Sequence, residues 1–181
     1  MKLTQNLGRT RLSEIKDLYL RAFPANERKP FFMIRKRQAE GSMEILSVES
    51  DTGDFLGLAI TILYNDIVLL DYFAIDDVHR NGGVGSLALR LLFERYTGRR
   101  FLLEIEAPDI PSENTADRIR RKAFYLKNGM TVMPFRVILF GIEMEILTNG
   151  SQVSFDEYHE IFTQIFTPWI ASKIQRASQK S

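Results

Sequence analysis

The sequence predicts one mixed α/β (α+β) domain, in which helices cover both faces of a mostly antiparallel sheet of about six to seven strands. Its 181 residues, 45% of them apolar, suit one domain with a substantial core. Helical patterns come first and are followed by apolar runs with short turn signals between them, as in an antiparallel meander. The last of these runs leads into glycines and a further helical pattern, which predicts a parallel strand pair at the centre of the sheet.

Two helices are expected before the meander. Ser13 is placed to cap a helix that begins at Glu14 and ends before Pro24. The inward face of this helix would carry Ile15, Leu18, Tyr19 and Ala22. A polar, turn-rich connector over residues 24–30 then leads to a second helix over residues 31–39.

Three strands follow in the predicted meander. Residues 43–50 alternate between apolar and polar types, and residues 55–64 form a second strand pattern after a Thr-Gly-Asp turn signal. Residues 67–75 are a continuous apolar run, too uniform to have one face in water. We therefore expect 67–75 to be a central strand.

A glycine-rich loop and a helix come after this central strand. The loop spans residues 80–86, and Leu87, Leu91 and Leu92 recur about one helical turn apart beyond it. Residues 101–107 form the next strand pattern. Because a helix separates it from 67–75, the two strands should be parallel, in a right-handed crossover.

The remaining segments predict another helix and two closing strands. Thr115 would cap a helix over residues 115–128, and Gly129 would supply its left-handed stop. The helix is expected to turn Ile119, Ala123 and Leu126 inward. Strands are expected over 130–133 and 136–147, with Pro134 between them.

The tail is an amphipathic helical pattern over residues 154–177, broken by Pro168. We therefore expect one domain over residues 1–181, with 151–181 as a C-terminal helical extension.

The glycine loop favours an anionic ligand. Glycines at a helix start let the backbone approach a ligand closely and present unpaired amide N–H groups at the positive end of the helix dipole, which suits a pyrophosphate. Gly83, Gly85 and Ala88 fit the dinucleotide fingerprint, and Glu104 falls about twenty residues later, where a ribose-binding acid would lie. The polar residues before the loop and the antiparallel strands upstream argue against that fold.

Two motifs in the right order resemble the GNAT acyltransferase superfamily. Residues 80–86, Arg-Asn-Gly-Gly-Val-Gly-Ser, resemble its Arg/Gln-x-x-Gly-x-Gly/Ala signature, and residues 123–130, Ala-Phe-Tyr-Leu-Lys-Asn-Gly-Met, resemble its Phe-Tyr-x-x-x-Gly-Phe helix end. The order of elements also matches over residues 2–147. The resemblance implies an N-acetyltransferase that moves an acetyl group from acetyl-CoA to a primary amine by direct attack in a ternary complex.

The resemblance also implies where the co-substrate acetyl-CoA would bind. The pyrophosphate would rest on the loop, and the pantetheine would run along the central strand, which the resemblance places beside a splayed parallel neighbour. An asparagine that many members carry seven residues before the motif tyrosine is replaced here by Arg118, and Asn114 is the candidate substitute. The expected cofactor-binding residues are Phe73, Ile75, Arg80, Asn81, Gly82, Gly83, Val84, Gly85, Ser86, Asn114, Arg118 and Arg121.

The catalytic candidates are one phenol and several carboxylates. Tyr125, four residues before Gly129, occupies the motif position of a hydroxyl that donates to the departing thiolate. A protonated amine also needs a base, for which Glu104 and Asp71 rank together, ahead of Glu106. Glu27 in the polar connector is a further candidate.

Composition narrows the remaining possibilities. Net charge is +1, so nothing favours a nucleic acid or membrane partner, and the chain has no cysteine and two histidines, so we expect no metal site. Because the sequence has no long apolar run and no signal-peptide pattern, we expect a cytoplasmic protein. We also expect it to be monomeric or homodimeric and to take a small-molecule or peptide amine as acceptor. Alternatives are a non-catalytic acyl-CoA-binding or sensor module and, less favoured, a dinucleotide-binding domain.

Overall fold

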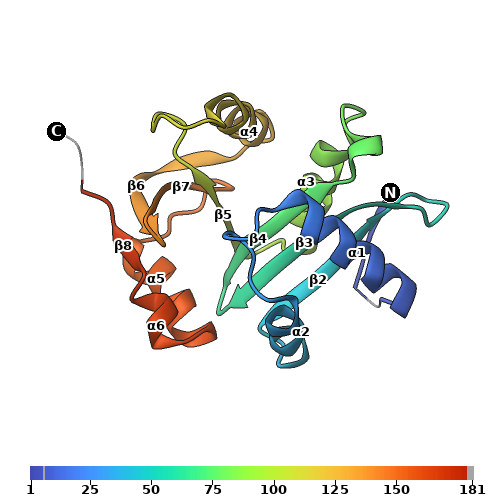
Figure 1. The fold of residues 1–181 in the computed structure, drawn as a ribbon, viewed down its shortest axis with the longest axis horizontal. Helices are drawn as coiled ribbons and strands as arrows, with labels where there is room; N and C mark the ends of the chain where they lie inside the picture. Colours follow the sequence, from blue (N-terminus) through green and yellow to red (C-terminus); the bar gives the residue numbers. More distant parts are fainter. Residues whose placement is uncertain (6, 179–181) are drawn as a thin grey trace. The chain divides into compact units, whose positions relative to one another are not determined.

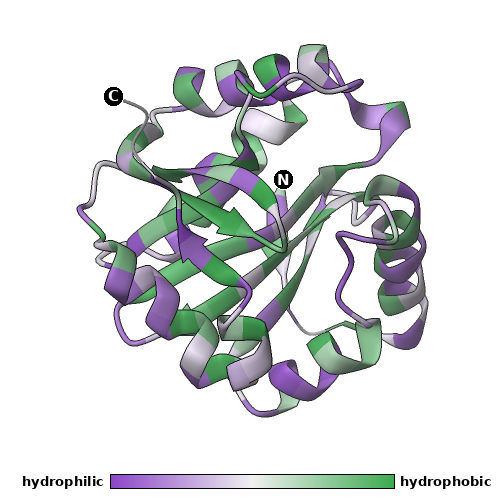
Figure 2. Cartoon of the chain, turned by 60° about the vertical axis from the view of Figure 1, so that its left-hand side comes forward, coloured by the Kyte–Doolittle hydropathy of each residue, from purple (hydrophilic) through white to green (hydrophobic). Residues whose placement is uncertain are grey.

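The computed structural model describes residues 1–5 and 7–178, and the chain divides into two compact units, Met1–Gly98 and Arg99–Ser181. Each unit is a small sheet with its own helices (Figure 1). Figure 2 shows that the strands carry mostly apolar residues, whereas the helices alternate between apolar and polar ones. This is the pattern of helices that bury one face against a sheet.

The first unit has four strands in the order β1-β2-β3-β4, with every neighbouring pair antiparallel. Its elements are β1 (Lys2–Thr4), α1 (Arg9–Ala22), α2 (Phe31–Ala39), β2 (Met43–Glu49), β3 (Phe55–Tyr64), β4 (Ile67–Ile75), the 3-10 turn η1 (Asp77–His79) and α3 (Val84–Arg95).

Helices lie on both faces of this first sheet. Tyr72 of β4 packs edge-on against Tyr19 of α1, with ring centroids 4.8 Å apart. Its neighbour Phe73 packs into the cluster that contains Ala88 of α3. Because successive strand residues point to opposite faces, α1 and α3 cover opposite sides of β4.

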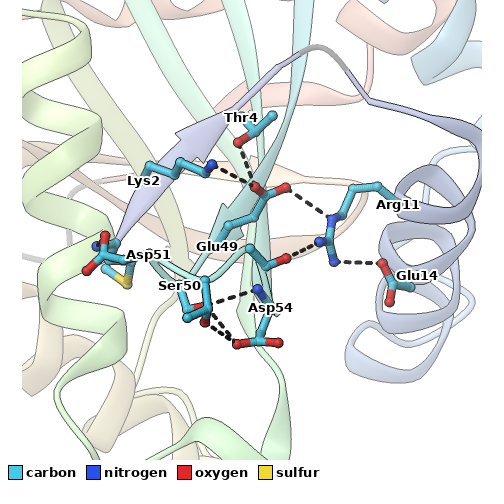
Figure 3. Close-up of polar contacts among 11 residues, drawn as sticks. Lys2, Thr4, Arg11, Glu14, Glu49, Ser50, Asp51 and Asp54 are labelled. Carbon is cyan, nitrogen blue, oxygen red and sulfur yellow. Dashed lines mark hydrogen bonds and ion pairs between the residues drawn. The ribbon is translucent and has the colours of Figure 1, made fainter.

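A buried carboxylate fastens α1 to the edge of this sheet (Figure 3). Glu49 of β2 accepts a hydrogen bond from Thr4 of β1 at 2.9 Å and pairs with the Arg11 Nε of α1 at 3.0 Å. Arg11 also donates to the Gly53 carbonyl at 2.5 Å and lies over the Phe55 ring, 5.4 Å from its centroid. One guanidinium therefore links α1 to β2 and to the turn before β3.

A β-bulge interrupts the pairing of β4 with β3. Ile60 pairs with Tyr72, but the next residue, Thr61, pairs with Leu70, so Asp71 has no partner in the register. A bulge of this kind re-aims the side chain of the extra residue. Asp71 and Tyr72 consequently reach the same neighbour, Lys29.

The second unit has four strands in the order β5-β7-β6-β8, again with antiparallel neighbours. Its elements are β5 (Arg100–Glu106), α4 (Thr115–Lys127), β6 (Thr131–Leu139), β7 (Ile142–Thr148), α5 (Phe155–Ile165), α6 (Pro168–Ala171) and β8 (Ile174–Arg176).

The predicted mixed α/β fold class with a mostly antiparallel sheet is confirmed. The described residues form eight strands, rather than about six to seven, because the short segment β8, in the extension expected to be helical, also pairs with β6. The bounds of α2, β3 and β4 agree with the prediction. That residues 1–181 act as a single domain stays a prediction; segment 151–181 holds α5, α6 and also the strand β8.

Three local predictions for the helices are wrong. Helix α1 begins at Arg9 with Gly8 as its N-cap, so Ser13 lies inside it. On α4 the buried residue is Tyr125, and its N-cap is Asn114 rather than Thr115. The apolar side chains expected to face inward on α4, Ile119 and Leu126, are 55% and 43% exposed.

Pro134 does not separate two strands, as predicted, but lies inside β6. The register between β6 and β7 shifts between Val132 and Arg136, so Pro134 falls at an irregularity where a missing N–H is tolerated. The β6–β7 connection is instead made by Phe140 and Gly141, both with positive φ. None of the described helices is long and apolar enough to cross a membrane.

Candidate functional site

The glycine loop, residues 80–86, leads from η1 into α3. Two of its residues adopt a left-handed backbone conformation: Asn81 has φ 67°, and Gly83, the N-cap of α3, has φ 78°. This geometry lets the chain reverse within a few residues so that the N-terminus of α3 opens at the loop. Asn81, Gly82 and Gly83 are exposed. The loop is therefore accessible and is shaped as an anion-binding helix start.

Arg80 is held back against the strand rather than extended. Its Nε donates to the Ile75 carbonyl at 3.2 Å, and its Nη1 pairs with Asp77 at 2.7 Å. Half of the side chain remains exposed, at 52%. The guanidinium of Arg80 thus adds positive charge at the start of the loop, and its contacts with Ile75 and Asp77 hold this end of the loop in place.

Phe73 and Ile75 use their side chains to support the loop. Both are half-buried and pack with Val84, at the start of α3, against the buried Ala88. A ligand along this part of β4 would therefore be read by backbone groups, as a strand-like partner is.

Asp71, in the β4 bulge, is paired with Lys29 of the connector between α1 and α2. The Lys29 Nζ lies 2.7 Å from one carboxylate oxygen and 2.9 Å from the other. The Asp71 side chain is 5% exposed and that of Lys29 is 22% exposed. The ammonium also lies over the Tyr72 ring, 5.2 Å from its centroid.

The connector is fastened over β4 by tyrosine hydroxyls. The Tyr72 hydroxyl accepts from the Lys29 amide and donates to the Glu27 carbonyl, both at 2.9 Å. The Tyr19 hydroxyl donates to the Lys29 carbonyl at 2.9 Å, and burial raises the pKa of Tyr19 above its ordinary value. The main chain at Lys29 is therefore fixed from both sides, while the side chain of Glu27 is exposed.

In the second unit, Glu104 of β5 accepts a hydrogen bond from the hydroxyl of Tyr158. Tyr158 is fully buried on α5, and Glu104 is half-buried. The C-terminal extension thus supplies a partner to one of the predicted bases.

Glu106 gathers three of the predicted cofactor residues. Arg118 donates to its Oε1, Arg121 lies 3.6 Å from its Oε2, and Asn114 donates to the same oxygen at 3.3 Å. The side chains of Glu106 and Arg118 are 8% and 10% exposed, whereas Arg121 is 46% exposed. Arg118 and Glu106 form a buried pair that holds the start of α4, and Arg121 remains available to an outside anion.

Tyr125, the predicted acid, is buried on α4, one turn after Arg121. Desolvation raises the pKa of its phenol to about 12, and the Arg121 charge offsets part of this effect. Within residues 1–5 and 7–178, no hydrogen bond to its hydroxyl is found. The left-handed Gly129, with φ 86°, ends α4 as predicted, and the Met130 amide returns to the Tyr125 carbonyl at 3.1 Å.

Two residues of these sites were missed by sequence reasoning. Lys29 is one of several charges in a polar connector, and nothing in the sequence pairs it with Asp71. The amphipathic pattern of the C-terminal extension accounts for the ring of Tyr158 but not for its hydroxyl. No group of histidine, aspartate and glutamate side chains that could hold a metal ion occurs in the described part of the chain.

Sequence comparison yields no relative: no family model matches the chain, and neither does any curated protein. Solved structures do match. A protein from Bacteroides thetaiotaomicron, assigned to the GNAT acetyltransferases, aligns with a TM-score of 0.74 at 19% identity over 92% of this chain and 98% of its own. The fold is that of the GNAT acetyltransferases.

Other structures with the GNAT fold agree. An aminoglycoside 6'-N-acetyltransferase complexed with coenzyme A aligns with a TM-score of 0.65 at 14% identity, over 85% of this chain and 100% of its own. The ribosomal-protein-S18-alanine N-acetyltransferase of Escherichia coli aligns with a TM-score of 0.62 at 19% identity, over 86% and 97%. The GNAT fold therefore extends over both units of the chain, although its sequence is far from each of these structures.

Proposed function

We propose that the protein is an acetyl-CoA-dependent N-acetyltransferase that acts on a primary amine. The observation that carries the proposal is the left-handed loop at Asn81 and Gly83, which follows β4 and η1 and opens the N-terminus of α3 in a chain with the GNAT fold. Such a helix start binds phosphate groups through backbone donors, without needing many cationic side chains.

The residues of the glycine loop fit the diphosphate of a CoA thioester. Asn81, Gly82 and Gly83 of the loop are exposed, and half of the Arg80 side chain at the start of the loop is accessible. Arg121, whose side chain is 46% exposed, is the favoured residue for a further phosphate contact in the second unit. Asn114 and Arg118, already engaged with Glu106, would act by holding α4 in place.

Acetyl-CoA, when bound, supplies an activated acetyl group whose leaving group is a thiolate. Tyr125 is proposed to donate a hydrogen bond to that sulfur, since a phenol with a pKa of about 12 stays protonated at neutral pH. A thiol has an ordinary pKa of about 8.5, so complete proton transfer from this phenol would be uphill. Tyr125 is therefore better suited to stabilise the thiolate than to protonate it fully.

Among the candidate bases, Asp71 is the carboxylate that we favour for contacting the acceptor's amine. All three ranked carboxylates have partners in their own units, but the partners differ in kind. Glu104 is bound by a fully buried phenol, and Glu106 by a buried guanidinium. The partner of Asp71 is an ammonium on a partly exposed, flexible side chain, which another ammonium can replace.

The acceptor is proposed to be a small-molecule or peptide amine. Structures with this fold include enzymes named for aminoglycosides, for spermidine and for the alanine of a ribosomal protein. Because one scaffold serves acceptors as different as these, the fold alone does not choose among them. A cytoplasmic location and a monomeric or homodimeric state stay predictions.

A CoA-release assay tests the function. Purified protein is mixed with acetyl-CoA and, in turn, spermidine, an aminoglycoside and a peptide with an N-terminal alanine, and free thiol is measured. Release that needs both the protein and an amine supports the proposal. Tight acetyl-CoA binding without release from any amine would favour the alternative, a non-catalytic acyl-CoA sensor.

A thermal-shift series tests the alternative that the protein is a dinucleotide-binding domain. A ligand that binds only the folded state raises Tm in proportion to the logarithm of its concentration above Kd. We expect acetyl-CoA and CoA to raise Tm and NAD(P) to leave it unchanged. The reverse result would overturn the assignment of the loop.

A further inference from the structure

The ammonium group of Lys29 is bound in the way that a ligand is bound, rather than as one half of a surface ion pair. Its ammonium touches both oxygens of Asp71, at 2.7 and 2.9 Å, and lies over the ring of Tyr72. A carboxylate next to an aromatic face is a general recognition site for ammonium groups. Here the site is filled by a side chain of the same chain.

The site is rigid on its own side and adjustable on the side of Lys29. Asp71 projects from a β-bulge and its side chain is 5% exposed, while Tyr72 is fixed by packing against Tyr19 and Phe23. The Lys29 main chain is held by tyrosine hydroxyls, but its ammonium sits on a four-carbon stem that is 22% exposed. The ammonium can therefore leave without moving the connector.

Exchanging one ammonium for another opens this site at a lower free-energy cost than leaving Asp71 without a cation. A buried carboxylate that loses its cation is strongly destabilising, whereas a carboxylate that changes partners keeps its charge compensated. Among the described residues, Lys29 is the one cation that pairs with Asp71. By contrast, buried Glu145 is paired with both Lys122 and Arg136, so Lys122 serves as a matched control.

We propose that Lys29 occupies the subsite for the acceptor's ammonium and that a primary amine binds by displacing it from Asp71. This rests on the proposed function, because it takes the acceptor to be an amine. Lys29 then acts as an internal competitor. The subsite selects a primary ammonium, whose N–H groups satisfy both carboxylate oxygens at once, over an alcohol or a quaternary ammonium.

The binding test replaces the lysine by a free amine. Lys29→Ala removes all of the side chain beyond Cβ, and n-propylammonium chloride restores the missing carbons and the ammonium. We expect propylammonium to raise the Tm of Lys29→Ala relative to sodium chloride of equal ionic strength, with n-propanol and tetramethylammonium inactive. Wild type and Lys122→Ala, in which Lys29 still competes for Asp71, should respond much more weakly, and the double variant Lys29→Ala/Asp71→Asn should not respond. No response in Lys29→Ala, or the same response without Asp71, would overturn the proposal.

A kinetic test covers the case in which Lys29→Ala does not fold. Lys29→Gln keeps the stem but removes the ammonium, so the amine no longer competes for Asp71, and its KM should fall at least about fivefold, with the Kd of acetyl-CoA unchanged. An unchanged amine KM in Lys29→Gln contradicts the proposal. If no variant transfers acetyl groups to any amine, the proposed function fails, while the propylammonium response still decides the subsite.

Discussion

The hydroxyl of Tyr158 on α5 hydrogen-bonds to the carboxylate of Glu104 on β5. One partner is a fully buried phenol from the C-terminal extension, and the other is a half-buried strand residue that the sequence proposes as a catalytic base. The contact offers a structural reason for a carboxylate in the middle of a largely apolar strand, because a buried charge needs hydrogen-bond donors. Structural and catalytic roles for Glu104 can be separated by experiment.

We expect Tyr158→Phe and Glu104→Gln each to lower the free energy of unfolding, by about 1 to 3 kcal/mol, because each removes one partner of a buried hydrogen bond. Denaturant unfolding of both single variants and the double variant gives the coupling energy between them. Steady-state kinetics on the same proteins decide the role. If the role of Glu104 is structural, Glu104→Gln should have near-normal kcat at a temperature where the variant is folded. A large loss of kcat in Glu104→Gln, but not in Tyr158→Phe, would support Glu104 as the catalytic base.

Tyr125→Phe should lower kcat for acetyl transfer at least about tenfold, because the thiolate loses its hydrogen-bond donor. The Kd of acetyl-CoA should change little, since the ring and its packing are kept. The matched control is Tyr96→Phe, which removes a phenol that hydrogen-bonds to Thr61 and Glu44 in the first unit. Equal kcat values for wild type and Tyr125→Phe would remove Tyr125 from the mechanism.

The pKa of Tyr125 also predicts a pH dependence. Burial raises it from about 10 to about 12, so the folded state favours the neutral phenol. The resulting stabilisation is present below pH about 10, the ordinary pKa, and is lost as the pH rises towards 12. Absorbance titration should show the phenolate that is missing in Tyr125→Phe appearing above pH 11 or so, later than the phenolate of an ordinary tyrosine. A decline of kcat near pH 9 that disappears in Tyr125→Phe would contradict this assignment.

The strands of the first unit were predictable because their signals are local. Continuous apolar runs and glycine or asparagine turns set the bounds of β3 and β4, and the loop at 80–86 carries its chemistry in its own backbone. Helix α4 was predicted with the wrong face because Ile119 and Leu126 fit a helical period yet remain exposed. Periodicity identifies a helix, but which stripe is buried depends on the sheet against which it packs.

Long-range polar pairs were beyond sequence reasoning for a related reason. Lys29 and Asp71 are 42 residues apart, and Glu104 and Tyr158 are 54 apart. Each pairing depends on a bulge or a helix position that no local pattern encodes. The candidate carboxylates were found from their residue type, and their partners required the three-dimensional structure.

Gly57 shows the same limit, since its place in the apolar strand pattern of β3 predicts no particular role. A Cβ at this position would lie 2.4 Å from the Ala74 carbonyl oxygen of β4, a backbone atom that cannot move aside on its own. We expect Gly57→Ala to cost about 1 to 3 kcal/mol through overpacking, read as a lower denaturant midpoint. Gly82→Ala is the control, because no atom lies within 4 Å of its added Cβ. Equal midpoints for the two variants would show that β3 and β4 can separate without cost.

The left-handed conformation of the glycine loop makes a prediction about cofactor affinity. At Gly83, with φ 78°, an added Cβ meets no atom within 4 Å, so Gly83→Ala would be strained by its backbone angle alone. That strain is worth about 1 to 2 kcal/mol and favours a loop in which the α3 amides no longer converge. We expect a roughly tenfold weaker Kd for acetyl-CoA, measured by calorimetry, because about 1.4 kcal/mol corresponds to a factor of ten. Asn81→Gly is the opposite case, since it relieves a left-handed non-glycine residue at φ 67° and should leave the affinity unchanged or improve it. Equal weakening by Asn81→Gly would mean that the asparagine side chain, rather than the backbone conformation of the loop, binds the ligand.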